Sequence, residues 1–285
     1  MEQSLTAGVF SDVRRSIFLF LVLCLALAGI ANAQNALEIM RRSVDHDSTN
    51  FERLKDYTYQ QRQEQREFDD SGNVKKTETE THDVMMLAGR PYERLIARDD
   101  KPLSEREARK EQEKVDRELD RREHMTPADR AKLEKGRQEA RKFMNEVPNA
   151  FLFRLLGEEK VSEKPAWVIQ LDPNPGFHPQ DMRAKVLAKL RGKVWIDQTE
   201  YQWVKAEMQA VDTLSFGLGL FRVAPGGLLN FEQTRVNGEV WVPTRALIRA
   251  DARLAYVKKV RAEIEITYRD YKKFQTDSRM VAEQK

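Results

Sequence analysis

Histidines are the residues from which an active site or a metal site is most readily built, and this sequence has four of them. His46, His82, His124 and His178 are scattered, with no H-x-x-x-H pair and no carboxylate at ligand spacing. A structural zinc site needs four clustered ligands, so this spacing argues against one. His178 precedes Asp181 by three residues, and this is the one acid–base pair worth naming. Its proline-rich surroundings favour a polar loop.

Motifs for nucleophilic, phosphate or calcium chemistry are not found either. The only cysteine, Cys24, lies in an apolar N-terminal run. The chain has no G-x-S-x-G motif, no Walker loop and no G-x-G-x-x-G after a strand. Asp69 to Asn73 (DDSGN) resembles a calcium loop but lacks its ligand spacing, and a hairpin turn explains it. We therefore predict that the protein is not an enzyme and carries no metal and no cofactor.

The first 33 residues have the pattern of a cleavable signal peptide. Arg14 and Arg15 precede an apolar run from Ile17 to Ile30, and Ala31-Asn32-Ala33 supplies small residues for cleavage. We predict cleavage after Ala33 and a domain spanning 34–285. An uncleaved anchor is the alternative, but the run is shorter than the roughly 20 apolar residues of a spanning helix. The mature chain then has no cysteine and depends on its core for stability.

A highly charged block separates two groups of strands. Fifteen of the twenty-one residues from Ser104 to His124 are Asp, Glu, Lys or Arg, and Thr126-Pro127 begins a second helical pattern. The block predicts a charged helical hairpin inserted at about 103–147. It either covers the sheet as a solvated spacer or forms a docking arm for a protein partner. Because both charge signs are mixed throughout the chain, with a net charge of +3, we expect no nucleic-acid partner.

The remaining segments predict a few short helices and many strands. An amphipathic helix is expected at 36–53, from Leu37, Met40 and Val44. A hairpin turning at 69–73 is polar on both faces, so it should project into solvent or lie at a sheet edge. A third strand follows at 90–98. Residues 150–156 suggest a helical turn before a strand at 167–171, and 182–191 suggest a basic helix that ends before Gly192.

Alternating patterns dominate the last third of the chain. Strands are predicted at 193–197 and 201–211, a hairpin at 214–235 with its tip near 225–227, a turn at Asn237-Gly238, and a strand at 240–249. The last strand is the clearest, because apolar and charged residues alternate from Leu254 to Arg269. Strands that are long, consecutive and one-sided curl into a barrel or half-barrel. The fold class is therefore α+β, an unclosed antiparallel half-barrel with covering helices.

Several stretches resemble a known group of proteins. The segment from Gly192 to Glu207 (GKVWIDQTEYQWVKAE) and the hairpins after it are similar to the outer-membrane lipoprotein-sorting superfamily. GKVWID, SFGLGLFRVAPGG and FEQTRVNGEVWVPTR more closely resemble an uncharacterised family of exported bacterial proteins, over the last third of the chain. The resemblance implies an apolar cavity for acyl chains beneath lidding helices. It also implies a strand arginine that bonds to the lid, for which Arg53, Arg62 and Arg66 are the candidates.

These patterns together suggest a periplasmic, non-enzymatic carrier that holds a lipid or a lipoprotein acyl chain and contacts membranes transiently at most. The alternative is an envelope module that binds a protein partner or senses stress. The aromatic and apolar residues of the last strands are the candidates for the cavity lining, although an ordinary buried hairpin and core tryptophans would give the same pattern. The candidates are Trp195, Trp203, Leu214, Phe216, Leu218, Leu220, Phe221, Tyr256, Ile264 and Ile266.

Overall fold

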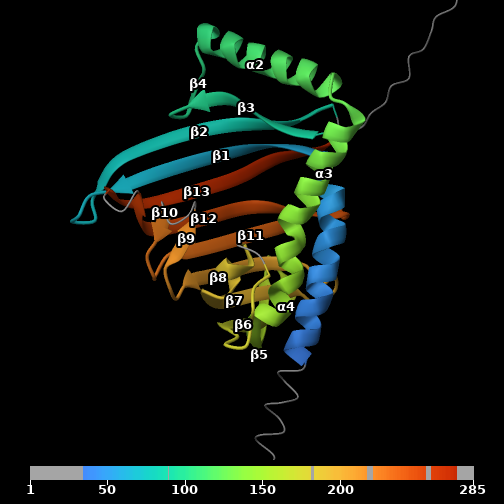
Figure 1. Ribbon diagram of the computed structural model, residues 1–285, viewed down its shortest axis with the longest axis vertical. Coiled ribbons are helices and arrows are strands. Elements are labelled where there is room, and N and C mark those ends of the chain that lie inside the picture. Colours follow the sequence, from blue (N-terminus) through green and yellow to red (C-terminus); the bar gives the residue numbers. More distant parts are fainter. Residues whose placement is uncertain (1–34, 89, 181–182, 217–220, 255–257, 275–285) are drawn as a thin grey trace, which may run out of the picture.

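A computed structural model describes residues 35–88, 90–180, 183–216, 221–254 and 258–274. The predicted signal peptide lies outside these residues. The described chain forms one curved antiparallel sheet with helices on a single side (Figure 1). The strand order is β4-β3-β2-β1-β13-β12-β11-β8-β7-β6-β5, and β9 and β10 form a short extension beside β12.

Most strands are longer than the typical five or six residues. Their bounds are β1 Tyr57–Phe68, β2 Val74–Leu87, β3 Arg90–Arg98, β4 Lys101–Pro102, β5 Phe151–Val161, β6 Lys164–Pro173, β7 Leu190–Asp197, β8 Trp203–Ala210, β9 Leu214–Phe216, β10 Phe221–Val223, β11 Leu228–Val236, β12 Val240–Leu254 and β13 Lys258–Lys273. The two edge strands, β4 and β5, do not pair with each other, so the sheet is an unclosed half-barrel of the predicted α+β class.

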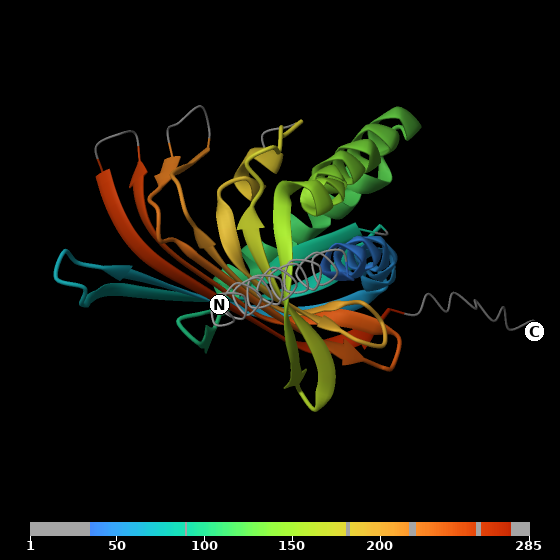
Figure 2. The ribbon, with the colours of Figure 1, turned by 90° about the horizontal axis from the view of Figure 1, so that it is seen from below.

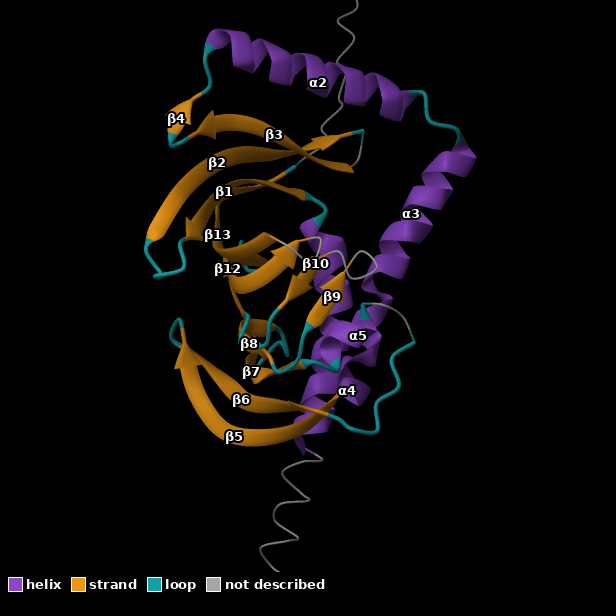
Figure 3. Ribbon diagram, turned by 60° about the vertical axis from the view of Figure 1, so that its left-hand side comes forward, coloured by secondary structure: helices purple, strands orange, loops and turns teal. Residues whose placement is uncertain are grey.

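The helices gather on the concave side of the sheet. They are the N-terminal helix (35–54), α2 Glu105–Glu123, α3 Pro127–Arg141, the 3-10 helix η1 Lys142–Glu146, α4 Val147–Ala150 and α5 Ala184–Leu187. Figure 3 shows the sheet curving around this side, and Figure 2 shows that the N-terminal helix and α3 cover one end of the strands. The far ends of β1, β2, β12 and β13 extend beyond them.

The main core lies between the N-terminal helix and strands β5 to β8. Met40 and Ile39 from the helix pack against Ile169, Leu171 and Val194 of the sheet, and all five are at most 3 % exposed. The helix amphipathicity predicted from the sequence is confirmed. Fully burying an aliphatic side chain contributes roughly 1.5–3 kcal/mol, so this cluster fixes the helix on the concave face.

The two turns with the clearest local signals form as predicted. Asp69 accepts a hydrogen bond from the backbone N of Asn73 at 2.8 Å and closes the β1–β2 turn, in which Gly72 has φ +86°. Asn237 and Gly238 join β11 to β12 with φ of +52° and +66°. Both residues of such a two-residue turn need positive φ, which Asn and Gly tolerate.

Four local predictions were wrong. Residues 151–161 form β5 rather than a helical turn, because Phe151 and Phe153 alternate toward the core. Residues 190–192 begin β7, so Gly192 is a strand residue and not a helix cap. Residues 214–235 are not one hairpin, since β9 pairs with β10 while β11 pairs with β8 and β12. Finally, the β1–β2 hairpin was expected to project into solvent or lie at a sheet edge. Instead β1 lies inside the sheet between β2 and β13, and only the tip of the hairpin extends into solvent.

The charged block forms α2 and α3, and α3 begins at its predicted cap. Ser104 and Glu107 form a capping box at α2, and Thr126 caps α3 with Pro127 in its first turn. The helices meet end to end around a bend rather than side by side (Figures 1 and 3). Val115 and Arg122 hold α2 against β2 and β3. Val115 is buried, and Arg122 donates to the carbonyls of Leu87, Arg90 and Pro91.

Candidate functional site

The concave face continues past the core as an uncovered apolar strip on β11, β12 and β13. Leu229 of β11 pairs with Ile248 of β12, which pairs with Ile264 of β13. Two residues further along each strand, Phe231, Ala246 and Ile266 form a second row of the same kind. Directly opposed residues of an antiparallel sheet point to the same face. The same rungs continue into Met208 and Ala206 of β8, which are core residues. The strip therefore faces the side on which the helices lie.

Exposure shows where the covering helices stop. Met208 and Ala206 are 8 % and 7 % exposed, whereas Leu229 and Ile248 are 39 % and 40 % exposed. Ile264 and Ile266 are half-buried. An uncovered apolar surface that adjoins a core is a frequent mark of a binding site. We call the six residues Leu229, Phe231, Ala246, Ile248, Ile264 and Ile266 the apolar strip.

Polar side chains take over where the strip reaches β1. Gln65 pairs with Ile264 and Gln63 with Ile266, and Glu78 and Glu80 of β2 follow on the same rungs. The concave face is therefore divided into an apolar half and a polar half.

A tyrosine cluster closes the helix-covered end of this face. The ring centroid of Tyr59 lies 5.0 Å from that of Tyr271 and 6.0 Å from that of Tyr268. Burial raises the pKa of Tyr59 to about 12 and raises the pKa of Tyr271 as well. The Tyr271 hydroxyl donates to the Pro243 carbonyl at 2.7 Å. These phenols are neutral at physiological pH and act as packing groups.

The structure distributes the predicted lining residues over several places. Ile264 and Ile266 lie in the apolar strip, and Trp203 packs against the core on the same face. Trp195 lies on the opposite, convex face, where its Nε1 donates to Glu159 at 2.7 Å, so it does not reach the strip. Leu214 is buried in β9.

The other predicted lining residues cannot be placed as lining groups. Phe216 and Phe221 pair as backbone neighbours in β9 and β10. Leu218, Leu220 and Tyr256 lie outside the described residues. Sequence reasoning missed Phe231, Ala246 and Ile248. The apolar Leu247 lies between the last two, so the alternation with charged residues that marks Ile264 and Ile266 is broken there.

The expected bond between a strand arginine and the lid is not found for any of the three candidates. Arg62 pairs with Asp100 at 2.7 Å, and Arg66 pairs with Glu263 at 3.0 Å, both on the convex face. Arg53 belongs to the N-terminal helix and donates to the carbonyl of Glu239. The Arg62 guanidinium lowers the pKa of Glu64, so the convex face is held as a network of ion pairs.

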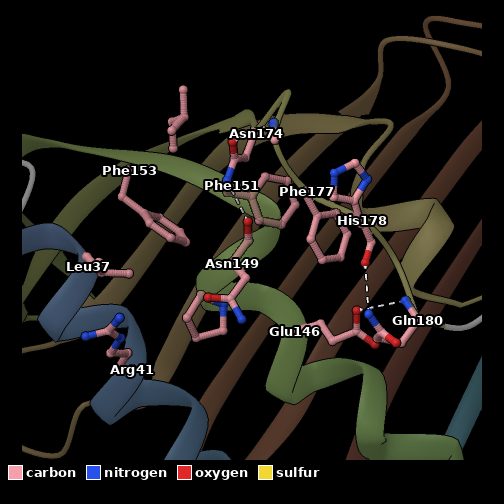
Figure 4. Close-up of a pocket in the computed structure, with 13 residues that line it drawn as sticks. Leu37, Arg41, Glu146, Asn149, Phe151, Phe153, Asn174, Phe177, His178 and Gln180 are labelled. Carbon is pink, nitrogen blue, oxygen red and sulfur yellow. Dashed lines mark hydrogen bonds between the residues drawn. The ribbon is translucent and has the colours of Figure 1, made fainter.

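A pocket lies at the opposite edge of the sheet, beside β5 (Figure 4). Its volume is about 680 Å³, within the range of small-molecule sites. We call it the edge pocket. Its apolar wall contains Phe151, Phe153 and Phe177, and its rim contains Arg41 and His178. The predicted partner of His178, Asp181, lies outside the described residues.

Neither a metal site nor a membrane-spanning helix is found among the described residues. No group of three or more His, Cys, Asp or Glu side chains is arranged to hold a metal ion within the ranges given above. None of the helices in that part of the chain is both long and apolar enough to cross a membrane.

Comparison with known proteins gives structural neighbours only. No family model and no curated protein matches the chain. An outer-membrane lipoprotein-sorting domain from Vibrio parahaemolyticus is 12% identical with a TM-score of 0.34, covering 86% of this chain and 94% of that one. A LolA-superfamily protein from Nitrosomonas europaea is 13% identical with a TM-score of 0.30, covering 83% and 92%. The MucA/MucB complex of Pseudomonas aeruginosa is 12% identical with a TM-score of 0.26, and the match covers 82% of this chain and 94% of that one.

Proposed function

We propose that this protein is an exported, periplasmic carrier that holds the acyl chain of a lipid or lipoprotein on its concave face and performs no covalent chemistry. The observation that carries this proposal is the apolar strip. Leu229 and Ile248 are about two-fifths exposed, although Met208, which pairs with Leu229 on β8, is a core residue. At roughly 25 cal/mol per Å², covering such a strip would favour binding of a flexible hydrocarbon.

The division of the concave face supports an amphipathic cargo. Gln63 and Gln65 adjoin Ile266 and Ile264 across a single strand boundary, so an acyl chain on the strip would have amide groups beside its polar end. A wholly apolar ligand would leave these groups without hydrogen-bond partners, which costs free energy.

Mass spectrometry of an organic extract tests this proposal. The full chain would be purified from its native host without detergent, and the extract compared with one from the protein after delipidation. A lipid or acylated peptide in near-stoichiometric amount supports the proposal. An empty protein that also fails to bind a fluorescent acyl probe overturns it.

A second candidate function, binding of a protein partner, is favoured by α2. This helix is 19 residues long and contacts the sheet through one stripe, while Arg106, Lys110 and Arg117 are exposed on its other faces. Charged surfaces of this kind set the rate and specificity of association. A pull-down would compare the wild type with a variant in which these three residues are changed to Glu. A stoichiometric protein partner that the variant no longer binds supports partner binding through α2. An unchanged pull-down would contradict it.

A further inference from the structure

The edge pocket has walls that are held in place by hydrogen bonds. Asn174 donates from its backbone N to the Ala150 carbonyl at 3.0 Å and from Nδ2 to the Asn149 carbonyl at 2.9 Å. Its Oδ1 accepts from the backbone N of Gly176 at 3.0 Å. The backbone N of Gln180 donates to Glu146 at 3.2 Å. The loop over the pocket is thus fixed to η1 and α4, which lowers the entropic cost of binding.

The inner wall of the pocket is aromatic. Phe151 and Phe153 come from β5 with ring centroids 6.2 Å apart, and Phe177 comes from the loop (Figure 4). Phe151 and Phe153 are 4 % and 7 % exposed, so they form a rigid floor. Phe177 is half-buried and leaves apolar surface for a ligand.

Two donors at the rim are not used by the fold. The side chains of Arg41 and His178 have no hydrogen bond or ion pair with any residue in the described ranges, whereas Asn174 and Glu146 are engaged in holding the loop. Arg41 comes from the N-terminal helix and His178 from the loop, on two sides of the opening. A guanidinium matches the planar geometry of a carboxylate, and an imidazole can donate a second hydrogen bond.

We propose that the edge pocket binds a monocarboxylate with an apolar body, its hydrocarbon part against Phe177 and the β5 floor and its carboxylate between Arg41 and His178. One negative charge fits better than two, because Arg41 is the one arginine or lysine among the residues that line the pocket, and the Glu146 carboxylate repels every anionic group. The site is separate from the apolar strip, since the filled core of β6, β7 and β8 lies between them. It does not depend on the carrier function.

Calorimetric titration of the full chain with dodecanoate tests this inference, with 1-dodecanol as the neutral probe of equal length. Dodecanoate should bind more tightly than dodecanol. Arg41→Gln should weaken dodecanoate binding by about tenfold or more, as expected for loss of a charge-assisted hydrogen bond, and leave dodecanol binding unchanged. His178→Gln should act in the same direction. Phe177→Ala should weaken both probes, because it removes apolar contact.

Arg154→Gln is the matched control. Arg154 is an exposed cation on β5 whose guanidinium donates to Gln170 outside the pocket, so its loss should not change either affinity. Thermal melting of each variant shows that it is folded. The inference is overturned if dodecanoate does not bind, if Arg41→Gln and Arg154→Gln have equal effects, or if dodecanoate binding does not respond to Arg41. Binding on the apolar strip would give the last result.

Discussion

Leu229 of β11 lies directly opposite Ile248 of β12, and both side chains are about two-fifths exposed on the face that elsewhere holds the core. Natural sheets usually cover such a pair with a helix or a second sheet. Here the N-terminal helix covers the neighbouring strands β5 to β8 and leaves this pair open. The pair therefore marks the boundary between the part of this face that forms the core and the part that the helices leave uncovered.

Ile248→Asp should reduce binding of an acyl probe without unfolding the protein. The aspartate places a charge beside Ile264, where a hydrocarbon chain would lie, so the affinity should fall by about tenfold or more. Because Ile248 is already 40 % exposed, the free energy of unfolding should fall by only about 1 kcal/mol. Fluorescence titration measures the affinity and urea denaturation the stability.

Val74→Asp is the control for this change. Val74 is 53 % exposed near the β1–β2 turn, away from the strip. Its replacement removes a similar amount of exposed apolar surface to Ile248→Asp and adds the same charge, but leaves the strip unchanged. Equal loss of affinity in both variants would contradict a role for the strip.

Glu263 holds three strands together on the convex face. It is 5 % exposed, accepts from Arg66 at 3.0 Å and from Nε of Arg249 at 2.7 Å, and so links β13 to both β1 and β12. Glu263→Gln should lower the free energy of unfolding by about 1–2 kcal/mol, less than for a wholly buried pair because both arginines reach solvent. Glu158→Gln, at an exposed position of β5, should change it little. A loss no larger than that of Glu158→Gln would mean that the network contributes nothing.

The regular parts of the fold were predictable because each residue's local preference agrees with its place in the sheet. The alternation of apolar and charged residues along β13 predicted the strand and its two faces, and Asn237-Gly238 predicted the hairpin turn. β1 was misplaced because polarity on both faces was taken for solvent exposure. Its convex side is instead covered by ion pairs such as Arg66–Glu263, which depend on strands almost two hundred residues apart in the chain.

The candidate site was predicted less completely. A period of two shows which residues share a face, but it does not show which face is covered, so Trp195 was expected to line the cavity although it lies on the convex side. The edge pocket combines the N-terminal helix, β5 and the 174–180 loop. No local signal marks Arg41 and His178 as residues of one pocket, because only tertiary packing places both on its rim.

The attachment of α2 to the sheet should depend on pH through Glu118. Hydrogen bonds from Arg121, and then from Arg122, lower the pKa of Glu118 from 4.5 to about 2. A lowered carboxylate pKa stabilises the folded state above the unfolded value, and this stabilisation is lost as the pH falls from about 4.5 toward 2. Arg122 also donates to the carbonyls of Leu87 in β2 and Arg90 in β3, so protonation of Glu118 frees the residue that anchors α2.

Urea denaturation of the wild type and of Glu118→Gln at several pH values checks this dependence. At pH 6 the wild type should be more stable by up to about 1 kcal/mol, since the pair is only partly buried. This difference in the free energy of unfolding should shrink as the pH falls from about 4.5 and vanish near pH 2. A difference that stays constant with pH would assign the effect to packing rather than to charge.

Gly192 permits a close approach of β7 and β8 that no other residue allows. A Cβ at this position would lie 2.0 Å from the carbonyl oxygen of Glu207 and 2.8 Å from Cα of Met208, which are backbone atoms of the paired strand. Gly192→Ala should therefore force the two strands apart next to the core and lower the free energy of unfolding by about 1–3 kcal/mol.

Gly136→Ala provides the opposite case, because Gly136 is in α3 with nothing within 4 Å of its added Cβ. There the change should raise stability by up to about 1 kcal/mol, since alanine favours helix. Urea denaturation of both variants measures the two effects, and a neutral Gly192→Ala would show that β7 and β8 can separate at this rung without cost.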